Sequence, residues 1–165
     1  HHREDALSHV EEEEGADGFG RLAGVTSNVA EALEKADMVM VVVPSSAHAE
    51  VAKNCAPHLK DGQIVVLHPG RTCGAIEFAG VLRKNDCKAN VTIAEAETFI
   101  YASRSDGPAQ ARIFRVKEAV PLAALPANRT RMVLDVIHEA YPQFIDGGNV
   151  LQTGFGVYGC GHPVQ

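Results

Sequence analysis

The feature that most constrains the fold is the apolar run Met38–Val43, in which no polar residue alternates with the aliphatic ones. Such a run predicts a strand that is buried on both faces, as in a parallel sheet covered by helices. Pro44 ends the run, and Ser45 or Ser46 can cap a helix that follows. A second apolar run, Ile64–Leu67, comes about twenty residues later. The two runs therefore read as neighbouring buried strands.

The segment between these runs has the spacing of an amphipathic helix. One face of this helix is expected to be buried, and it carries His48, Val51, Ala52, Cys55 and Leu59. Strand, helix and strand together predict a βαβ unit with a right-handed crossover. Ligands of open parallel sheets bind at the carboxyl ends of the strands. Val43-Pro44-Ser45 and His68-Pro69-Gly70 are two such ends, and we expect them to lie side by side.

The rest of the chain continues the alternation of strands and helices. Further expected elements are a helix over 71–82, strands over 91–94, 113–117 and 120–125, a helix begun by Asn128, and extended chain at 150–153. The segment 103–110 contains Asp-Gly-Pro and is expected to be a loop. This order predicts an α/β fold: a Rossmann-like, doubly wound, mostly parallel sheet that is incomplete at its N-terminus.

Composition excludes several classes of protein. The chain has 165 residues and a formal charge of −6, and it lacks a basic cluster, which argues against a nucleic-acid partner. No apolar run approaches the roughly 20 residues of a membrane helix. The four cysteines are widely spaced, which favours a reducing compartment, the cytoplasm, over a disulfide framework. No metal motif is present. The chain does not begin with Met, and we expect it to be a piece of a longer protein.

Several polar residues allow more than one interpretation. His48 is either a packed helix residue or part of a ligand pocket at the strand ends. Glu95 and Glu97 follow a strand and are interpreted as surface acids. The segment Gly154–Gly159 matches the dinucleotide pattern G-x-G-x-x-G, but no βαβ unit follows it. His162 could serve as a proton donor at neutral pH.

Several longer motifs together resemble the opine dehydrogenases, the octopine/nopaline dehydrogenase family. They are ADMVMVVVPSSAHAEVA, APHLKDGQIVVLHPGRTCGAIEF, IAEAETFIYASR, ALPA and YPQF, in this order. The similarity covers roughly residues 15–165. It implies a Rossmann-type domain that binds NAD or NADP, here residues 1–148, and the start of a helical substrate domain, here residues 149–165. The family condenses an amino acid with a 2-oxo acid and reduces the imine by hydride transfer.

The resemblance also implies roles for individual residues. His162, in the pair His162-Pro163, matches the family's acid/base histidine. Two groups of residues would contact ligands. The cofactor side is lined by Val43, Pro44, Ser45, His48, Pro69 and Gly70, and the substrate junction is faced by Thr98 and Tyr101. The implied partners are small molecules, an amino acid and a 2-oxo acid, and a homodimer is compatible with the family.

Two other functions stay open. The chain could belong to a related Rossmann dehydrogenase, such as ketopantoate reductase or glycerol-3-phosphate dehydrogenase, which share a V-x-x-P strand end followed by a helix. It could instead be a non-catalytic nucleotide-binding or dimerisation module. Because the first βα unit is absent, we expect this piece to be inactive alone. The strand at Met38 would then have an open edge, which predicts aggregation or partner-dependent folding.

Overall fold

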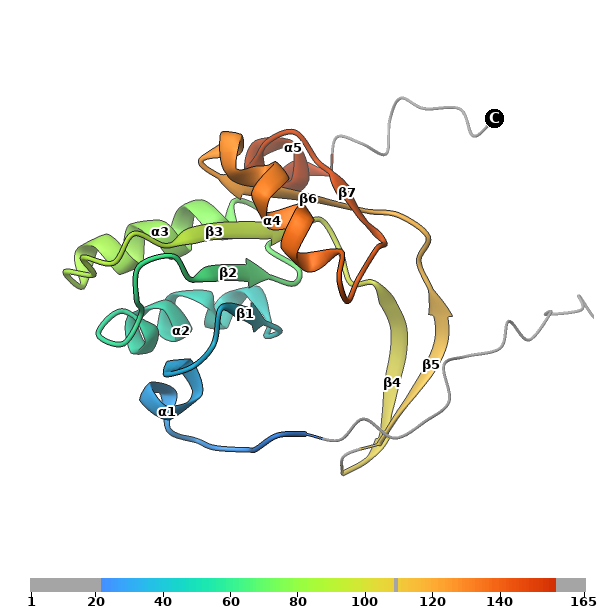
Figure 1. Ribbon diagram of the computed structural model, residues 1–165. Coiled ribbons are helices and arrows are strands. Elements are labelled where there is room, and N and C mark those ends of the chain that lie inside the picture. Colours follow the sequence, from blue (N-terminus) through green and yellow to red (C-terminus); the bar gives the residue numbers. More distant parts are fainter. Residues whose placement is uncertain (1–21, 109, 157–165) are drawn as a thin grey trace, which may run out of the picture.

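The structure is a computed structural model that describes residues 22–108 and 110–156. The helices are α1 (Val29–Leu33), η1 (Ser45–Ala47), α2 (His48–Cys55), α3 (Gly74–Lys84), η2 (Ala127–Arg129), α4 (Thr130–Ile137) and α5 (Val150–Phe155). The strands are β1 (Met38–Val41), β2 (Ile64–Leu67), β3 (Thr92–Ala96), β4 (Tyr101–Gly107), β5 (Gln110–Val116), β6 (Val120–Leu125) and β7 (Phe144–Asp146). Five of these strands form the central sheet, and β4 and β5 form a separate pair (Figure 1).

The central sheet is mostly parallel, in the order β1-β2-β3-β6-β7. β1 pairs with β2 and β2 with β3 in parallel, as the βαβ pattern predicts. β6 runs antiparallel to β3, and β7 is parallel to β6. The expected Rossmann-like class is therefore confirmed, with helices on the two faces of the sheet.

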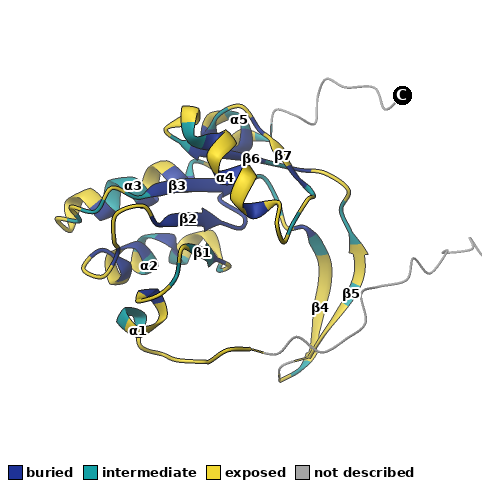
Figure 2. Cartoon of the chain, viewed as in Figure 1, coloured by how far each residue is buried: buried dark blue, intermediate teal, exposed yellow. Residues whose placement is uncertain are grey.

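The alternation of side chains along β2 divides the core into two layers. Val65 and Leu67 pack on one face, in a cluster with residues from α1, α2, α3 and α5. Ile64 and Val66 pack on the other face, in a cluster with the buried side of α4. All four residues are buried, which explains why this strand has no polar alternation (Figure 2). β2 is the interior strand that its sequence predicts.

β1 differs from β2 although its sequence is just as apolar. It lies at the end of the sheet formed by the described residues, so only β2 pairs with it. Met38, Val39 and Met40 are half-buried, and only Val41 is fully buried. Val42, expected to continue the strand, is outside it and 55% exposed. The prediction of burial on both faces is thus met only in part, because a second neighbouring strand is not among the described residues.

The segment 103–110 was expected to be a loop and is instead the outer part of a β-hairpin. β4 and β5 pair antiparallel from Tyr101 opposite Val116 to the tip near Gly107. We call this hairpin, residues 101–116, the arm. Figure 1 shows that it extends away from the central sheet, and the base is closed by the Lys117 N–H, which donates to the Ile100 carbonyl at 2.9 Å.

Two further expectations were wrong in detail. The segment 150–153 is helical rather than extended, because Asn149 caps α5 by accepting from the backbone N–H groups of Leu151 and Gln152. α3 begins at Gly74 rather than at residue 71, and it buries Phe78. In the described part of the chain, no helix has the length and apolar character needed to cross a membrane.

Candidate functional site at the carboxyl edge of the sheet

The carboxyl ends of β1 and β2 lie next to each other, as the βαβ pattern predicts. Val41 is the register partner of Leu67, so the chain leaves both strands at one edge of the sheet. Beyond β1, Val43 packs against the core while Pro44 and Ser45 are exposed at the start of η1. This edge therefore offers accessible backbone and side chains at the place where a parallel sheet binds ligands.

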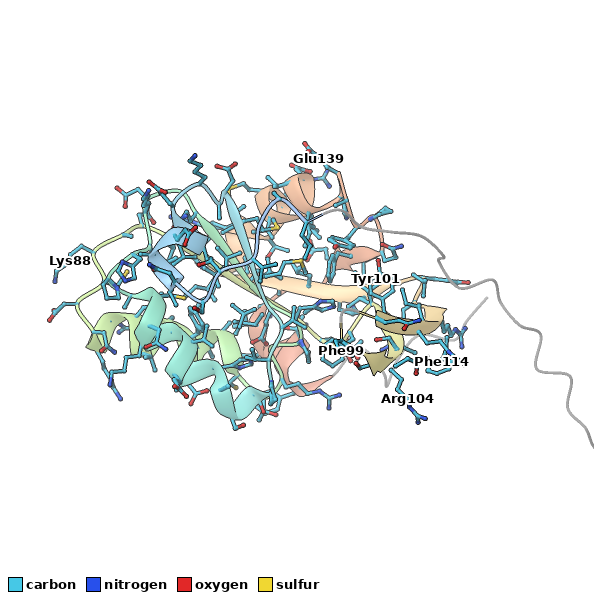
Figure 3. All side chains as sticks on the ribbon, turned by 90° about the horizontal axis from the view of Figure 1, so that it is seen from below. Lys88, Phe99, Tyr101, Arg104, Phe114 and Glu139 are labelled. Atoms are coloured by element: carbon cyan, nitrogen blue, oxygen red, sulfur yellow. The ribbon has the colours of Figure 1, made fainter. Side chains whose placement is uncertain are left out.

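A cavity of about 440 Å³ opens at this edge. We call it the His68 cavity; its lining is Met40, Val42, His68, Phe99, Tyr101, Ser103 and Tyr141. Figure 3 labels two of these residues, Phe99 and Tyr101, near the base of the arm, whereas Arg104 and Phe114 lie farther along it. The walls are mostly aromatic and aliphatic, which suits a flat ring with few polar atoms.

His68 is held in one orientation by its neighbours. Its Nε2 accepts a hydrogen bond from the Ile100 N–H at 3.0 Å, so Nδ1 carries the ring hydrogen. Phe99 and Phe144 pack edge-on against the imidazole, with ring centroids 5.5 and 5.6 Å away. Burial lowers the pKa of His68, and the charge of Lys117 lowers it further. The imidazole is therefore a neutral group at neutral pH with one fixed acceptor and one remaining donor.

A second cavity, of about 550 Å³, is polar. We call it the junction cavity; it is lined by Arg71, Thr72, Glu97, Thr98, Thr153, Gly154, Phe155 and Gly156. Thr98 Oγ1 accepts a hydrogen bond of 2.8 Å from Lys117 Nζ. The cavity thus brings together a guanidinium, a carboxylate and hydroxyl groups, a set that can bind a zwitterionic or carboxylate ligand.

Glu95 lies under the junction cavity and is fully buried. Its Oε2 accepts from the Ala75 N–H at 2.8 Å, and its Oε1 accepts from Thr153 Oγ1 at 3.0 Å. Burial raises the pKa of Glu95, and the two hydrogen bonds act in the opposite direction. The interpretation of Glu95 as a surface acid is wrong, because β3 has a neighbouring strand on each side and α3 and α5 pack over it.

His48 lies beneath the start of α3 and lines neither cavity. A Cβ at Gly74 would be 3.0 Å from His48 Nδ1, so the glycine makes room for the ring. The side chain is fully buried and neither ring nitrogen has a hydrogen-bond partner. Burial lowers the pKa of His48, although the charge of Glu77 opposes this effect. Its role on the cofactor side stays a prediction.

The structure separates the two residues that were expected at the substrate junction. Tyr101 lines the His68 cavity, and Thr98 lines the junction cavity. Pro69 and Gly70 follow β2, where Gly70 N–H donates to the Ala96 carbonyl at 3.0 Å. His162 lies outside the described residues, so its role as acid/base stays a prediction. The domain boundary at residue 148 also stays a prediction, and α5, just beyond it, packs on β3 and β6.

His68 was predicted only as part of a strand end, and Glu95 was interpreted as a surface acid, so the sequence patterns did not reveal the contacts of either residue. His68 ends an apolar strand, which is a usable signal for a ligand-facing position. Glu95 interrupts the apolar strand at 92–96, and an acid within such a strand indicates a buried carboxylate with specific partners. Neither signal identifies the partners, because these come from residues 20 to 58 positions away.

Comparison with known proteins gives matches to several dehydrogenases. Residues 22–72 match a family model described as the N-terminus of NAD-dependent glycerol-3-phosphate dehydrogenase. The chain is 36% identical over 141 residues to an opine dehydrogenase of Arthrobacter sp. (strain 1C). This match covers 85% of the chain and 39% of that protein, so the chain spans about two fifths of its relative's length.

Solved structures with the same arrangement include octopine dehydrogenase. Its complex with NADH and L-arginine has a TM-score of 0.70 at 22% identity and covers 87% of this chain and 40% of that one. A complex with NADH and agmatine has a TM-score of 0.68. A ketopantoate reductase from Ralstonia eutropha JMP134 has a TM-score of 0.52 at 20% identity, over 76% of this chain and 38% of that one. These likenesses show the Rossmann-like fold.

Proposed function

Because this chain is an NAD-binding domain of the opine dehydrogenase family, we propose that it forms the cofactor side of an oxidoreductase that joins an amino acid to a 2-oxo acid. The proposal rests chiefly on one observation, the 36% identity to an opine dehydrogenase over 141 residues. The chain spans 39% of that relative, so the complete reaction requires more residues than this structure contains. We propose that the chain alone binds the cofactor without turnover.

The edge of the sheet fits the nicotinamide end of NAD. The His68 cavity has an apolar wall formed by Val42 and aromatic walls formed by Phe99 and Tyr101. A flat heteroaromatic ring fits such walls, and the Nδ1–H of His68 could donate to its carboxamide oxygen. NAD bound here would supply or accept the hydride. We propose NAD rather than NADP because the family model that matches the chain describes an NAD-dependent enzyme.

The residues of the chain would then bind, orient and shield the reacting groups. Val43, Pro44 and Ser45 follow β1 and are proposed to border the cofactor, together with Pro69 and Gly70 after β2. His48, whose ring is buried beneath the start of α3, is proposed to support this cofactor side from within the fold. The junction cavity would hold the substrates, with Thr98 as a hydrogen-bonding group on its wall. Tyr101 would shield the contents of the His68 cavity from water at the base of the arm. His162 is proposed to donate the proton that accompanies hydride transfer, because a histidine titrates near neutral pH.

A titration of the chain with NADH and with NADPH, followed by cofactor fluorescence, tests the first step of this proposal. We expect saturable binding of NADH, weaker binding of NADPH, and no turnover. The variant Val42→Asp places a charge in the His68 cavity and should weaken NADH binding by about tenfold or more, since burying an unpaired charge is costly. A matched control is Val136→Asp on α4, whose side chain is 41% exposed and lines neither cavity.

A chimera tests the reaction. The matched segment of the Arthrobacter opine dehydrogenase is replaced by this chain, and NADH oxidation is followed with an amino acid and a 2-oxo acid together. Turnover that requires both substrates is the expected result. Binding of NADH by the chain without turnover of the chimera on any such pair would contradict the proposed reaction and leave a nucleotide-binding module.

A second candidate is a dehydrogenase of the glycerol-3-phosphate type. It is favoured by the family-model match over residues 22–72, which includes β1, α2 and β2. This candidate predicts NADH oxidation with a single phosphorylated ketone and no requirement for an amine. The same chimera assay, run with dihydroxyacetone phosphate alone, separates it from the opine reaction.

A further inference from the structure

Glu95 joins two helices that are far apart in the sequence. Its Oε2 accepts from the backbone N–H of Ala75, in the first turn of α3, and its Oε1 accepts from the hydroxyl of Thr153 in α5. An anion or a polar carboxyl group at the start of a helix is favourable, because the first N–H groups of the helix have no partner within it. Glu95 thus takes one bond from each helix while it remains in the middle of β3.

The surrounding chain makes room for this side chain at two glycines. A Cβ at Gly70 would overlap with Glu95 Cβ, so no side chain fits at position 70 beside Glu95. A Cβ at Gly154 would lie 3.0 Å from Glu95 Oε1 and 2.9 Å from the Cys73 backbone nitrogen. Any larger residue at position 70 would force Glu95 out of its place. The backbone of the strand end and that of α5 are therefore both shaped around one carboxyl group.

Burying a carboxyl group carries a free-energy penalty that burying an apolar group of the same size does not. Moving it out of water is unfavourable unless hydrogen bonds compensate, and an apolar side chain of similar volume would pack without that desolvation penalty. Burial also raises the pKa of Glu95, as this cost requires. A glutamate at this buried position is therefore better explained by the groups that it orients than by the space that it fills.

The two groups that Glu95 holds belong to two segments, or walls, that both line the junction cavity. Arg71 and Thr72 come just before α3, and Thr153 and Gly154 belong to α5. A backbone hydrogen bond of 3.0 Å from the Thr72 N–H to the Gly154 carbonyl connects the same two walls. The width of the cavity is therefore set by the contact between the start of α3 and α5.

We propose that Glu95 is a positioning residue that fixes α5 against the start of α3 and so sets the junction cavity, the site proposed to bind the substrates. The geometry of the link between α3 and α5 does not depend on the proposed function. Only the identity of the ligand as a substrate rests on the proposed function. The carboxyl group does not have to be ionised for this role. Thr153 Oγ1 is also 3.3 Å from the Val150 carbonyl, so its hydroxyl can turn to that oxygen and accept a hydrogen from a protonated Glu95.

This arrangement makes a specific prediction about two replacements of similar length. In Glu95→Gln, the amide oxygen can accept from Ala75 N–H while the amide NH₂ donates to Thr153 Oγ1, so both links survive. In Glu95→Met, the length is kept and both hydrogen bonds are lost. A merely space-filling residue would tolerate Met at least as well as Gln.

Amide hydrogen exchange of the 165-residue chain without cofactor measures the link directly. We expect Glu95→Met to speed exchange of the α5 amides by about tenfold or more relative to the α4 amides, because a helix of six residues depends on its tertiary contacts. Glu95→Gln should leave the α5 amides close to the unaltered chain. The proposal would be overturned if Glu95→Gln sped α5 exchange as much as Glu95→Met does. It would also be overturned if Glu95→Met left α5 exchange unchanged.

A second pair of variants covers the case in which Glu95→Met does not fold. Thr153→Val removes the hydroxyl but keeps the branched shape, and Thr153→Ser keeps the hydroxyl. We expect Val to speed α5 exchange and Ser to restore most of the protection; equal exchange in the two variants contradicts the link. The exchange experiments contain no cofactor, so their result does not depend on the NADH titration. The positioning role of Glu95 can therefore be contradicted while the proposed NADH binding holds, and the reverse.

Discussion

The strands of the central sheet and the strands of the arm lie in opposite environments. All residues of β2 and β3 are buried, whereas β4 and β5 contain exposed and half-buried residues only, among those described (Figure 2). Strands of the sheet gain stability from the helices packed on them. The arm depends on its own ladder, on the hydrogen bond that closes its base and on the packing of Tyr101 and Val116 against the core. The comparison shows that strand formation and contribution to stability are separate properties.

The largest expected effect comes from removing the same aromatic ring in the two regions. Phe78 in α3 is completely buried, and Phe78→Ala should lower the free energy of unfolding by about 3–5 kcal/mol. Phe114 in the arm is 53% exposed, and Phe114→Ala should change it by about 0.5 kcal/mol or less. Urea unfolding of both variants measures the difference. Similar losses in the two would show that the arm is part of the cooperative core.

The next effect concerns His68 and His48, two buried histidines outside the arm that differ in their hydrogen bonds. His68→Leu leaves the Ile100 N–H without its acceptor and should cost about 1–3 kcal/mol. His48→Leu removes two unpaired ring nitrogens and should be neutral or stabilising by about 1 kcal/mol. Thermal unfolding of the two single variants checks the order. A larger loss for His48→Leu would mean that its ring nitrogens have partners.

The pH dependence of the free energy of unfolding should reveal the buried carboxyl group of Glu95 in the central sheet, in contrast to the exposed charged residues of the arm. The folded state raises the pKa of Glu95, so it binds a proton more tightly than the unfolded chain does. The stabilisation from Glu95 is therefore complete below its ordinary pKa of 4.5 and is lost as the pH rises through the folded-state pKa. Glu95→Gln lacks this loss, and its stability relative to the unaltered chain should increase with pH above 4.5. Denaturant unfolding across this range would contradict the assignment if the two curves stayed parallel.

The smallest effect is expected from shortening the arm. Ala102 and Arg115 are register partners, so an Asn-Gly turn can join them and replace the outer strands. We expect a change of about 1 kcal/mol or less in the free energy of unfolding, because the deleted residues contribute little to the core. The melting curve of the shortened chain is compared with that of the full chain. A loss of several kcal/mol would show that the arm stabilises the sheet.

The parts of the fold that the sequence predicted are those governed by local periodicity. The run at 64–67 and the spacing of Ala52, Cys55 and Leu59 have one consistent solution, and the structure adopts it. The arm was missed at 103–110 because its exposed strands lack an apolar alternation and contain the turn residues Asp106 and Gly107. α5 was missed because its single apolar turn is too short to show a period, although Asn149 supplied a capping signal.

The site was predictable only as a location. The pairing of β1 with β2 placed the two strand ends together, as expected from the βαβ unit. The division into two cavities, with Tyr101 in one and Thr98 in the other, depends on how the chain turns after β3. Likewise, the burial of Glu95 depends on α5, which lies 55 or more positions farther along the chain. Such long-range contacts are not encoded in any local pattern.

The hydrogen bond that closes the base of the arm keeps the two halves of the chain next to each other. The chain leaves the body at Ile100 and returns at Lys117, two residues joined by a backbone hydrogen bond of 2.9 Å. Residues before and after the arm are then held together by the ladder between β3 and β6 and by the α5 contacts, without needing a covalent link. We therefore expect a cut at the arm's tip to yield two complementary fragments that can reassemble. The same tolerance makes the tip an insertion point for a reporter domain.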